Sequence, residues 1–350
     1  MKKRGNRLKQ TLWAIVLMLA LAAGAGAFLI YKVLFAPNVE VSTKTDPYVY
    51  IPTETDFEGV VKILHERHLL LDEESFRRTA EMMKYTNKVK PGKYLLKPRM
   101  NNKDLITLLR SGKQTPVKVV FNNIRTKDQL ARKVSEQIEA PASSIMNLLG
   151  DTDYLRQLGF NAENVLALFI PDTYEMYWNT SADAFIKRMK REYDNFWTVQ
   201  IRKKADSIGL KPVEISVIAS IVQQETRRED EKSIIAGVYI NRLRKGWRLE
   251  ADPTLVFALG DYSVNRVLNV HKQINSPYNT YMYGGLPPGP ICLPTIASLK
   301  AVLNYKKHNY MYFCAREDFS GYHSYASTYF QHLLNARKFQ KALDKRGIKS

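Results

Sequence analysis

Cysteine, glycine, proline and acidic residues are all scarce in this chain of 350 residues. Its two cysteines, Cys292 and Cys314, are too few for a disulfide-built scaffold or a four-cysteine zinc site. The 17 glycines and 15 prolines exclude a collagenous or low-complexity chain. An aromatic content of 11% argues against disorder. The length predicts about two domains with a substantial core.

The shortage of acids gives the chain a strongly basic balance, with 53 Lys and Arg against 34 Asp and Glu and a net charge of +19. Residues 1–35 hold six basic residues and no acid, so the rest of the chain still carries +13. Such a surface suits an anionic polymer or a membrane surface. A solvated basic face explains any single cluster at least as well.

Residues 11–31 form a run of 21 residues without a charge, directly after a basic N-terminal segment. As a helix this run is about 31 Å long, the thickness of a bilayer core. The basic flank predicts a cytoplasmic N-terminus and export of the rest, so we expect no nucleic-acid partner. The alternative is a cleaved signal peptide, because residues 23–25 and 25–27 fit the A-x-A cleavage pattern.

The remaining sequence mixes helical and strand patterns without a repeat or a regular βαβ alternation, which predicts an α+β fold. Residues 36–46 are polar and non-periodic and read as a linker. A strand–helix–helix–strand unit follows, with strands at 48–52 and 93–96, helices at 56–67 and 72–85, and then a helix at 102–111 and a strand at 117–121. Further helices are expected at 127–138, 142–149, 181–207, 212–226, 230–245, 294–304 and 325–345.

One carboxylate stands out because it continues the apolar face of its helix. Pro212 suits a first helical turn, and Ile218, Ile221 and Glu225 follow at i, i+3 and i+7. Burial raises the pKa of a carboxyl group, as a general acid at neutral pH requires. The alternative is that the helix leaves the core at its last turn and Glu225 is solvated, as the polar residues 226–230 suggest.

Downstream of Glu225, short motifs rich in polar and aromatic residues, here called words, lie among the expected helices: 240–243 (INRL), 251–254 (ADPT), 276–281 (SPYNTY) and 284–290 (GGLPPGP). Sugars need this combination of flat rings, amides and hydroxyls. Together with 218–226 (IASIVQQET), 285–291 (GLPPGPI) and 323–328 (HSYAST), these words resemble the endolytic murein transglycosylases of the MltG/YceG type. The resemblance covers nearly the whole chain.

The resemblance implies a single-pass enzyme of the inner membrane that cuts peptidoglycan glycan strands internally, without metal or cofactor. It also implies a small LysM-like βααβ domain at 47–121, a mixed α/β catalytic domain at 122–350 on the periplasmic or extracytoplasmic side, and proximity to penicillin-binding proteins. Glu225 matches the family's catalytic glutamate, while a second glutamate common in the family is Gln223 here. Another family motif, E-G-[YW]-x-x-P-D-T, appears as residues 166–173 (LALFIPDT), so Leu166 stands in place of its glutamate. Glu250 stands where Gln is usual, and the meaning of Cys292 is open.

The mechanism that we expect uses Glu225 first as an acid, to protonate the glycosidic oxygen between N-acetylmuramic acid and N-acetylglucosamine, and then as a base. The muramyl C6 hydroxyl closes a 1,6-anhydro ring, so no water is consumed. The substrate-binding candidates are Asn241, Tyr278, Asn279 and Tyr281. Asp252 reads as a turn or helix-cap residue, with a second catalytic carboxylate as the alternative.

Two rival functions remain open at this point. One is a hydrolytic muramidase in which Glu250 or Asp252 supplies a second carboxylate. The other is a non-catalytic peptidoglycan-binding scaffold. Metal catalysis fits poorly, because His65 and His68 lack the H-E-x-x-H spacing. For His323 and His332 we expect sugar contacts or a structural role, and for the two cysteines either buried thiols or one disulfide.

Overall fold

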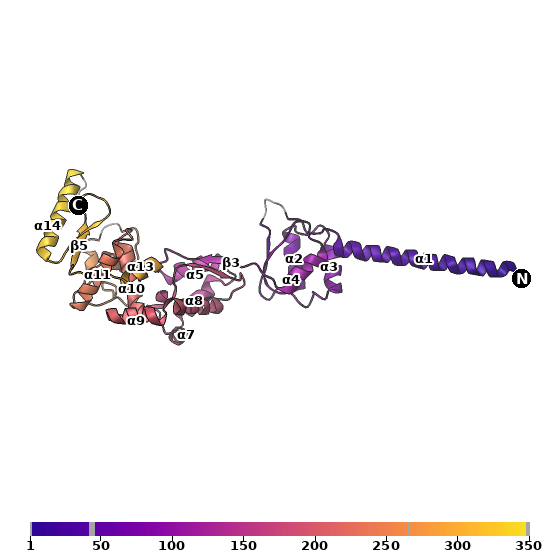
Figure 1. The fold of residues 1–350 in the computed structure, drawn as a ribbon, viewed down its shortest axis with the longest axis horizontal. Helices are drawn as coiled ribbons and strands as arrows, with labels where there is room; N and C mark the ends of the chain where they lie inside the picture. Colours follow the sequence, from indigo (N-terminus) through magenta and orange to yellow (C-terminus); the bar gives the residue numbers. More distant parts are fainter. Residues whose placement is uncertain (1, 42–45, 265–266, 348–350) are drawn as a thin grey trace. The chain divides into compact units, whose positions relative to one another are not determined.

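The computed structural model describes residues 2–41, 46–264 and 267–347, with side chains from residue 9 onward. The chain divides into two compact units: Met1–Val117 with Glu175–Asn179, and Lys118–Tyr174 with Thr180–Ser350. We refer to them as unit 1 and unit 2 and describe each by itself (Figure 1). The chain passes between them at β3 (Val117–Val120) and β4 (Thr173–Met176), which form a two-stranded sheet.

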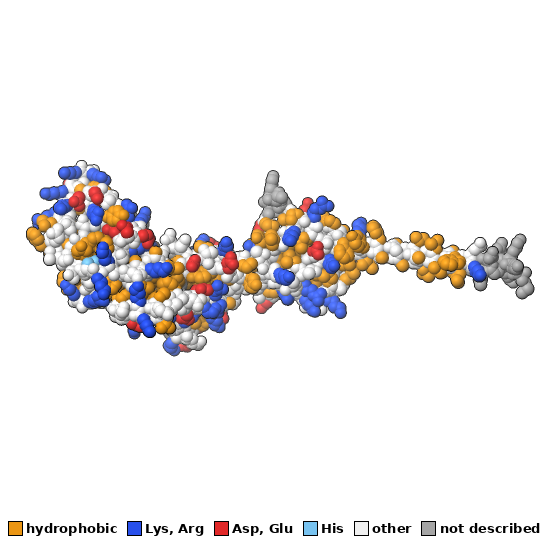
Figure 2. Space-filling view, in the orientation of Figure 1, with side chains coloured by type: hydrophobic (Ala, Val, Ile, Leu, Met, Phe, Trp, Pro, Cys, Tyr) orange, Lys and Arg blue, Asp and Glu red, His pale blue; other side chains and the backbone are white. Residues whose placement is uncertain are grey.

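Unit 1 begins with the helix α1 (Lys2–Phe35). Its part from Lys9 to Phe35 is long and apolar enough to cross a membrane, by length and composition alone. Hydrophobic side chains cover this stretch and are exposed along it, among them Leu17, Leu21 and Phe28 (Figure 2).

The rest of unit 1 has the predicted strand–helix–helix–strand order. The elements are β1 (Tyr48–Ile51), α2 (Phe57–Glu66), α3 (Glu73–Met82), β2 (Gly92–Leu95) and α4 (Asn102–Ser111). β1 and β2 pair antiparallel, with Tyr48 opposite Leu95. The side chains of Asp56, Asp72 and Asn101 cap the three helices, and the apolar faces of these helices meet in one core. The order of elements is confirmed, and the likeness to LysM domains stays a prediction.

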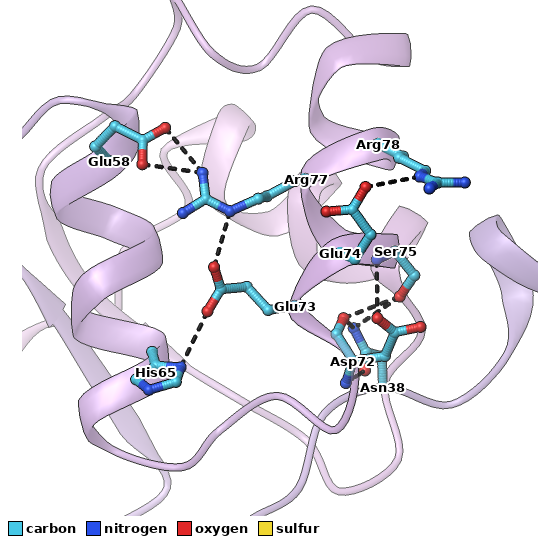
Figure 3. A network of polar contacts seen from close by, with 9 residues as sticks. All are labelled: Asn38, Glu58, His65, Asp72, Glu73, Glu74, Ser75, Arg77 and Arg78. Carbon is cyan, nitrogen blue, oxygen red and sulfur yellow. Dashed lines mark hydrogen bonds and ion pairs between the residues drawn. The ribbon is translucent and has the colours of Figure 1, made fainter.

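The segment predicted as a linker starts inside the core of unit 1. The backbone N–H groups of Asn38 and Val39 donate to the carbonyl of Met100, and both side chains are buried. Residues 42–45 lie outside the described residues. Figure 3 shows how Asn38 receives a hydrogen bond from the Asp72 backbone N–H (2.6 Å), next to a chain of ion pairs along α3. In that chain Nδ1 of His65 lies 3.0 Å from Oε2 of Glu73, so this histidine faces a carboxylate.

Unit 2 is mostly helical and continues with α5 (Lys127–Ser135), α6 (Ala142–Gly150), α7 (Thr152–Gln157), the 3₁₀ turn η1 (Val165–Leu168), α8 (Ala182–Phe196), α9 (Val199–Ile208), α10 (Pro212–Glu225), α11 (Lys232–Arg244), α12 (Asp252–Leu259), the 3₁₀ turn η2 (His271–Gln273), α13 (Ile296–Leu303), β5 (Tyr312–Ala315), β6 (His323–Ala326) and α14 (Tyr329–Lys345). The helices α10, α11 and α13 pack on one another (Figure 1). β5 and β6 form an antiparallel hairpin in which Phe313 is opposite Tyr325.

Two predictions about unit 2 are wrong. The single helix expected at 181–207 is two helices, because the buried Trp197 ends α8 and the Thr198 side chain caps α9. The helix expected at 325–345 begins only at Tyr329, since residues 323–326 pair with β5. The mixed α/β class and the helices α5, α6, α10, α11 and α13 agree with prediction to within a few residues.

Candidate functional site

The helix α10 crosses the interior of unit 2 and ends at Glu225. Pro212 opens it as predicted, and every residue from Ile215 to Val222 is buried. A helix that is buried on all sides presents no single apolar stripe, so periodicity alone does not decide where Glu225 points. Its position does, because it is the last residue of the helix and is partly buried.

Glu225 lies against Tyr239 of the neighbouring helix α11. The Tyr239 hydroxyl donates a hydrogen bond to Oε1 of Glu225 (2.5 Å), and the tyrosine ring is buried. The pKa of Glu225 is raised from 4.5 to about 7: burial is the largest cause and the charge of Asp252 adds to it, while Tyr239 and Arg242 oppose the rise. The carbonyl end of the α10 dipole also disfavours a negative charge at this position. Near neutral pH the group therefore holds its proton about half of the time.

Glu225 opens onto a cleft of about 780 Å³ that lies within unit 2. Its polar lining residues are Arg125, Gln224, Glu225, Arg227, Asp252 and Tyr262. Its apolar lining residues are Pro253, Val256, Phe257, Val264, Val267 and Ile291. A cleft of this size, lined by apolar side chains and a few polar groups, is typical of a ligand site.

The second carboxylate in the cleft is Asp252, the first residue of α12. The cap position of α12 is occupied by Ala251, and Oδ1 of Asp252 instead accepts a hydrogen bond from the Tyr281 hydroxyl (2.6 Å). Its charge is close enough to help raise the pKa of Glu225. Glu250 is exposed and lies 3.4 Å from a guanidinium nitrogen of Arg242, outside the residues that line the cleft.

The four predicted sugar-binding residues have different surroundings. Tyr281 touches Asp252 at the cleft, as described above. Tyr278 packs behind the cleft wall, with its ring centre 4.6 Å from that of Phe257. The side chain of Asn279 is fully buried, and its amide N–H groups donate to the carbonyls of Lys272 (2.9 Å) and Ile274 (2.8 Å).

Asn241 lies away from the Glu225 cleft. It lines a separate concavity of about 920 Å³ formed by α9, α11 and the segment after α13. Its side-chain amide donates to the carbonyls of His308 (2.7 Å) and Tyr310 (3.0 Å), which fastens that segment to α11. Neither Asn241 nor Asn279 is therefore turned toward Glu225.

The loop before α13 contributes Ile291 to the cleft lining and is held by Gln223. Oε1 of Gln223 accepts hydrogen bonds from the Thr295 backbone N–H (2.6 Å) and the Ser298 hydroxyl (3.1 Å) at the start of α13. In the same loop Gly289 approaches the Glu163 carbonyl so closely that any Cβ would collide with it. Cys292 is buried beside Gln224, and both cysteines are free thiols.

The β5–β6 hairpin supports Tyr239 from behind. The Phe313 ring meets the Tyr239 ring edge-on at 6.0 Å and the His323 ring at 5.3 Å. The hairpin is fixed by Glu231, a buried carboxylate at the start of α11. Glu231 accepts from the His323 backbone N–H (2.8 Å) and the Tyr325 hydroxyl (2.8 Å), and Nδ1 of His323 lies 2.9 Å away. Residues 323–328 thus help to hold Tyr239, the hydrogen-bond partner of Glu225, in place.

Sequence reasoning missed four residues of this site. Tyr239 directly precedes the word 240–243 and could have been considered on that account. Arg227 belongs to the polar run 226–230, which entered the sequence analysis only as the reason for the alternative that Glu225 is solvated. Arg125 and Tyr262 carry no local signal, since they reach the cleft from elements far away in the sequence. Among the residues that the structure describes, no three His, Cys, Asp or Glu side chains are grouped to hold a metal ion.

Comparisons with known proteins agree with the predicted resemblance. The endolytic murein transglycosylase of Bacillus subtilis is 27% identical over 310 residues, which are 84% of this chain and 85% of that protein. The endolytic murein transglycosylase of Streptococcus pneumoniae R6 is 24% identical over 342 residues, which are 89% of this chain but 62% of that protein.

A crystal structure of a YceG-like protein from Listeria monocytogenes superposes with a TM-score of 0.54 at 25% identity, covering 82% of this chain and 98% of that one. A family model described as the YceG-like family matches residues 49–338. The match spans most of the described chain, including the strand–helix–helix–strand unit, Glu225 and the β5–β6 hairpin. The chain belongs to the YceG-like family.

Proposed function

We propose that this protein is an endolytic murein transglycosylase, which cleaves peptidoglycan glycan strands internally and leaves 1,6-anhydro-N-acetylmuramic acid ends. The observation that carries the proposal is the placement of Glu225. Its carboxyl group faces a cleft of about 780 Å³, and burial brings its pKa to about 7. The names of the relatives from B. subtilis and S. pneumoniae support the same reaction.

In the proposed reaction the protonated Glu225 donates its proton to the oxygen that links C1 of N-acetylmuramic acid to N-acetylglucosamine. The C1–O bond breaks, and N-acetylglucosamine leaves with a free hydroxyl. The Glu225 carboxylate then takes the proton of the muramyl C6 hydroxyl while that oxygen bonds to C1. The glutamate ends the cycle protonated, and water does not enter the balance.

The surrounding residues have supporting roles in this proposal. Tyr239 fixes the direction of the Glu225 carboxyl group and stabilises its anion after proton transfer, because it donates to Oε1. Tyr281 and Asp252 contact the sugar at the cleft. Tyr278 supports Phe257, a lining residue of the cleft, through their ring contact. We assign Asn241 and Asn279 to the scaffold, because their amides are engaged by backbone carbonyls.

Hydrolysis is the second candidate, and Asp252 favours it. A carboxylate near the acid is what a muramidase needs to activate water or to bond covalently to the sugar. The hydrogen bond from Tyr281 keeps an acceptor oxygen of Asp252 occupied, which weakens it as a base. The two reactions differ in their products, so product analysis separates them.

The location of the enzyme is also a proposal. We propose that α1 anchors the chain in the inner membrane with its N-terminus in the cytoplasm, so that unit 2 meets nascent peptidoglycan on the outer side. The region 47–121 would bind glycan in the manner of a LysM domain. Penicillin-binding proteins that polymerise the same strands would be its neighbours.

The test is digestion of purified sacculi and of uncrosslinked glycan strands, followed by mass spectrometry of the products. Wild-type protein should give anhydro-muramyl ends, and Glu225→Gln should give none while still binding glycan. Reducing muramyl ends would replace the transglycosylase proposal by the muramidase. Unchanged strand processing by Glu225→Gln would support the non-catalytic scaffold. Glu163→Gln, an exposed glutamate of unit 2, is the matched control.

A further inference from the structure

Two arginines line the Glu225 cleft without a carboxylate partner. Arg125 and Arg227 are both among its lining residues. Among the described residues no ion pair involves either of them. Both guanidinium groups therefore bring an uncompensated positive charge to the place where the proposed substrate binds.

Arg125 is held in place by neutral groups. Its guanidinium donates a hydrogen bond to Oε1 of Gln224 (3.0 Å), the residue before the catalytic glutamate. The guanidinium carbon also lies 4.5 Å from the centre of the Tyr262 ring. An arginine that is oriented by an amide and an aromatic face keeps its remaining N–H groups for another acceptor.

The carboxylates of the cleft do not explain these arginines. Asp252 is engaged by Tyr281, and the charges that act on Glu225 come from Asp252 and Arg242. The arrangement suits an anion that the ligand itself supplies.

The substrate chemistry indicates which anion this is. The sugar rings of a peptidoglycan strand carry hydroxyl and acetamido groups, which are neutral, and the lactyl carboxyl group of muramic acid is used up in the amide bond to the stem peptide. The free carboxylates of an uncrosslinked strand are on the stem peptides. A guanidinium binds a carboxylate through two parallel hydrogen bonds.

We infer that Arg125 and Arg227 form a carboxylate subsite, so that the cleft selects muramyl residues whose stem peptides carry free carboxylates over strands whose carboxylates are amidated. This inference rests on the proposed function, because it assumes a peptidoglycan strand in the cleft. It assigns substrate selection to two residues outside the words that carry the family resemblance.

The experiment measures binding with the full-length Glu225→Gln protein in detergent, so that the ligand is not consumed. Three soluble glycan oligomers of equal length are compared: with native stems, with stem carboxylates converted to amides, and with stems removed by an amidase and the lactyl carboxyl groups that this frees converted to amides. Native stems should bind about tenfold tighter than the other two, which is the factor that one charge-assisted hydrogen bond supplies at its lower end. Added salt should reduce that preference.

Arginine variants in the same background locate the effect. Arg125→Gln and Arg227→Gln should each weaken binding of native stems several-fold and leave the amidated and denuded oligomers unchanged; Arg227→Lys should retain part of the preference. Arg191→Gln, an exposed arginine of α8, is the control and should change nothing. Equal affinity for the three oligomers, or an equal loss for all three in the variants, overturns the inference.

Cleavage by the wild-type protein separates this inference from the proposed function. Cleavage of all three oligomers with the same kcat/KM would leave the transglycosylase proposal intact and refute the carboxylate subsite. Absence of cleavage, together with a preference for native stems in the binding assay, would refute the proposed reaction and retain the subsite.

Discussion

Glu225→Gln should raise the free energy of unfolding of unit 2, but only at pH values above about 4.5. The pKa of Glu225 is about 7 in the folded protein, against 4.5 for the free side chain. At about 1.36 kcal/mol for each pKa unit, the ionised carboxylate costs the folded state up to about 3 kcal/mol. Glutamine cannot ionise and keeps an oxygen that accepts from the Tyr239 hydroxyl. The substitution should therefore remove that cost.

The sign of the effect follows from the proton balance. Below pH 4.5 the carboxyl group is protonated in the folded and unfolded states alike, so the two proteins should be equally stable. Between this pH and about 7 the unfolded chain releases its proton first, and the wild type loses stability relative to the variant. Above pH 8 the difference should be constant at about 2 to 3 kcal/mol.

Hydrogen exchange measured by mass spectrometry on peptides from α10 gives a direct assay. At pH 8 the slowest amides of the variant should exchange about thirty to a hundred times more slowly than those of the wild type, and at pH 4 the two should be nearly alike. Glu163→Gln, at an exposed site, should show no such pH dependence. A difference that is the same at both pH values would refute the reasoning, because it would arise from packing and not from ionisation.

Four further outcomes are expected. The rate of glycan cleavage should fall tenfold per pH unit above about 7, as Glu225 loses its proton. A cleavage rate that stays the same up to pH 9 would contradict the role of Glu225 as an acid. Tyr239→Phe removes a donor that lowers the pKa of Glu225, so the fall of the cleavage rate should begin at a higher pH, while the maximal rate drops about 10- to 100-fold. A fall that begins at the same pH would contradict the hydrogen bond from Tyr239 to Glu225. Glu231→Gln should destabilise unit 2 by about 2 kcal/mol or more in denaturant titrations, through loss of the His323 pair, and an unchanged midpoint would show that the pair is dispensable. Gln223→Ala should cost about 1 kcal/mol in the same assay, because two donors at the start of α13 lose their acceptor, and full stability would mean that water replaces it.

Local chemistry was enough to predict most of the helices. The helix at 102–111 was predicted at its observed bounds, because Asn101 caps it and Gly112 adopts a left-handed conformation after it. The break after α8 follows instead from the burial of Trp197, which no local pattern reveals. The strands β5 and β6 are four residues each and lack apolar alternation, so only their pairing with each other identifies them.

In the candidate site, too, some features follow from the local sequence and others only from the tertiary structure. Glu225 was predictable, because a carboxylate at the end of a buried helix is chemically unusual. Its partners come from other elements and are neighbours only in space, as the distance along the chain from Arg125 shows. Asn279 illustrates the opposite error: an amide suits a sugar or a backbone carbonyl equally well, and only its complete burial decides between them.

The dependence of Tyr239 on the β5–β6 hairpin has a consequence for biosynthesis. The His323 backbone N–H that Glu231 holds is made 92 positions later than Glu231 itself. While the ribosome is still adding those positions, Tyr239 has neither the Phe313 ring behind it nor the anchored hairpin. Contacts between such distant positions form late in folding. A growing or truncated polypeptide that ends before residue 326 thus carries the acid without its support, and the cell gains a cutting enzyme only when translation is nearly finished.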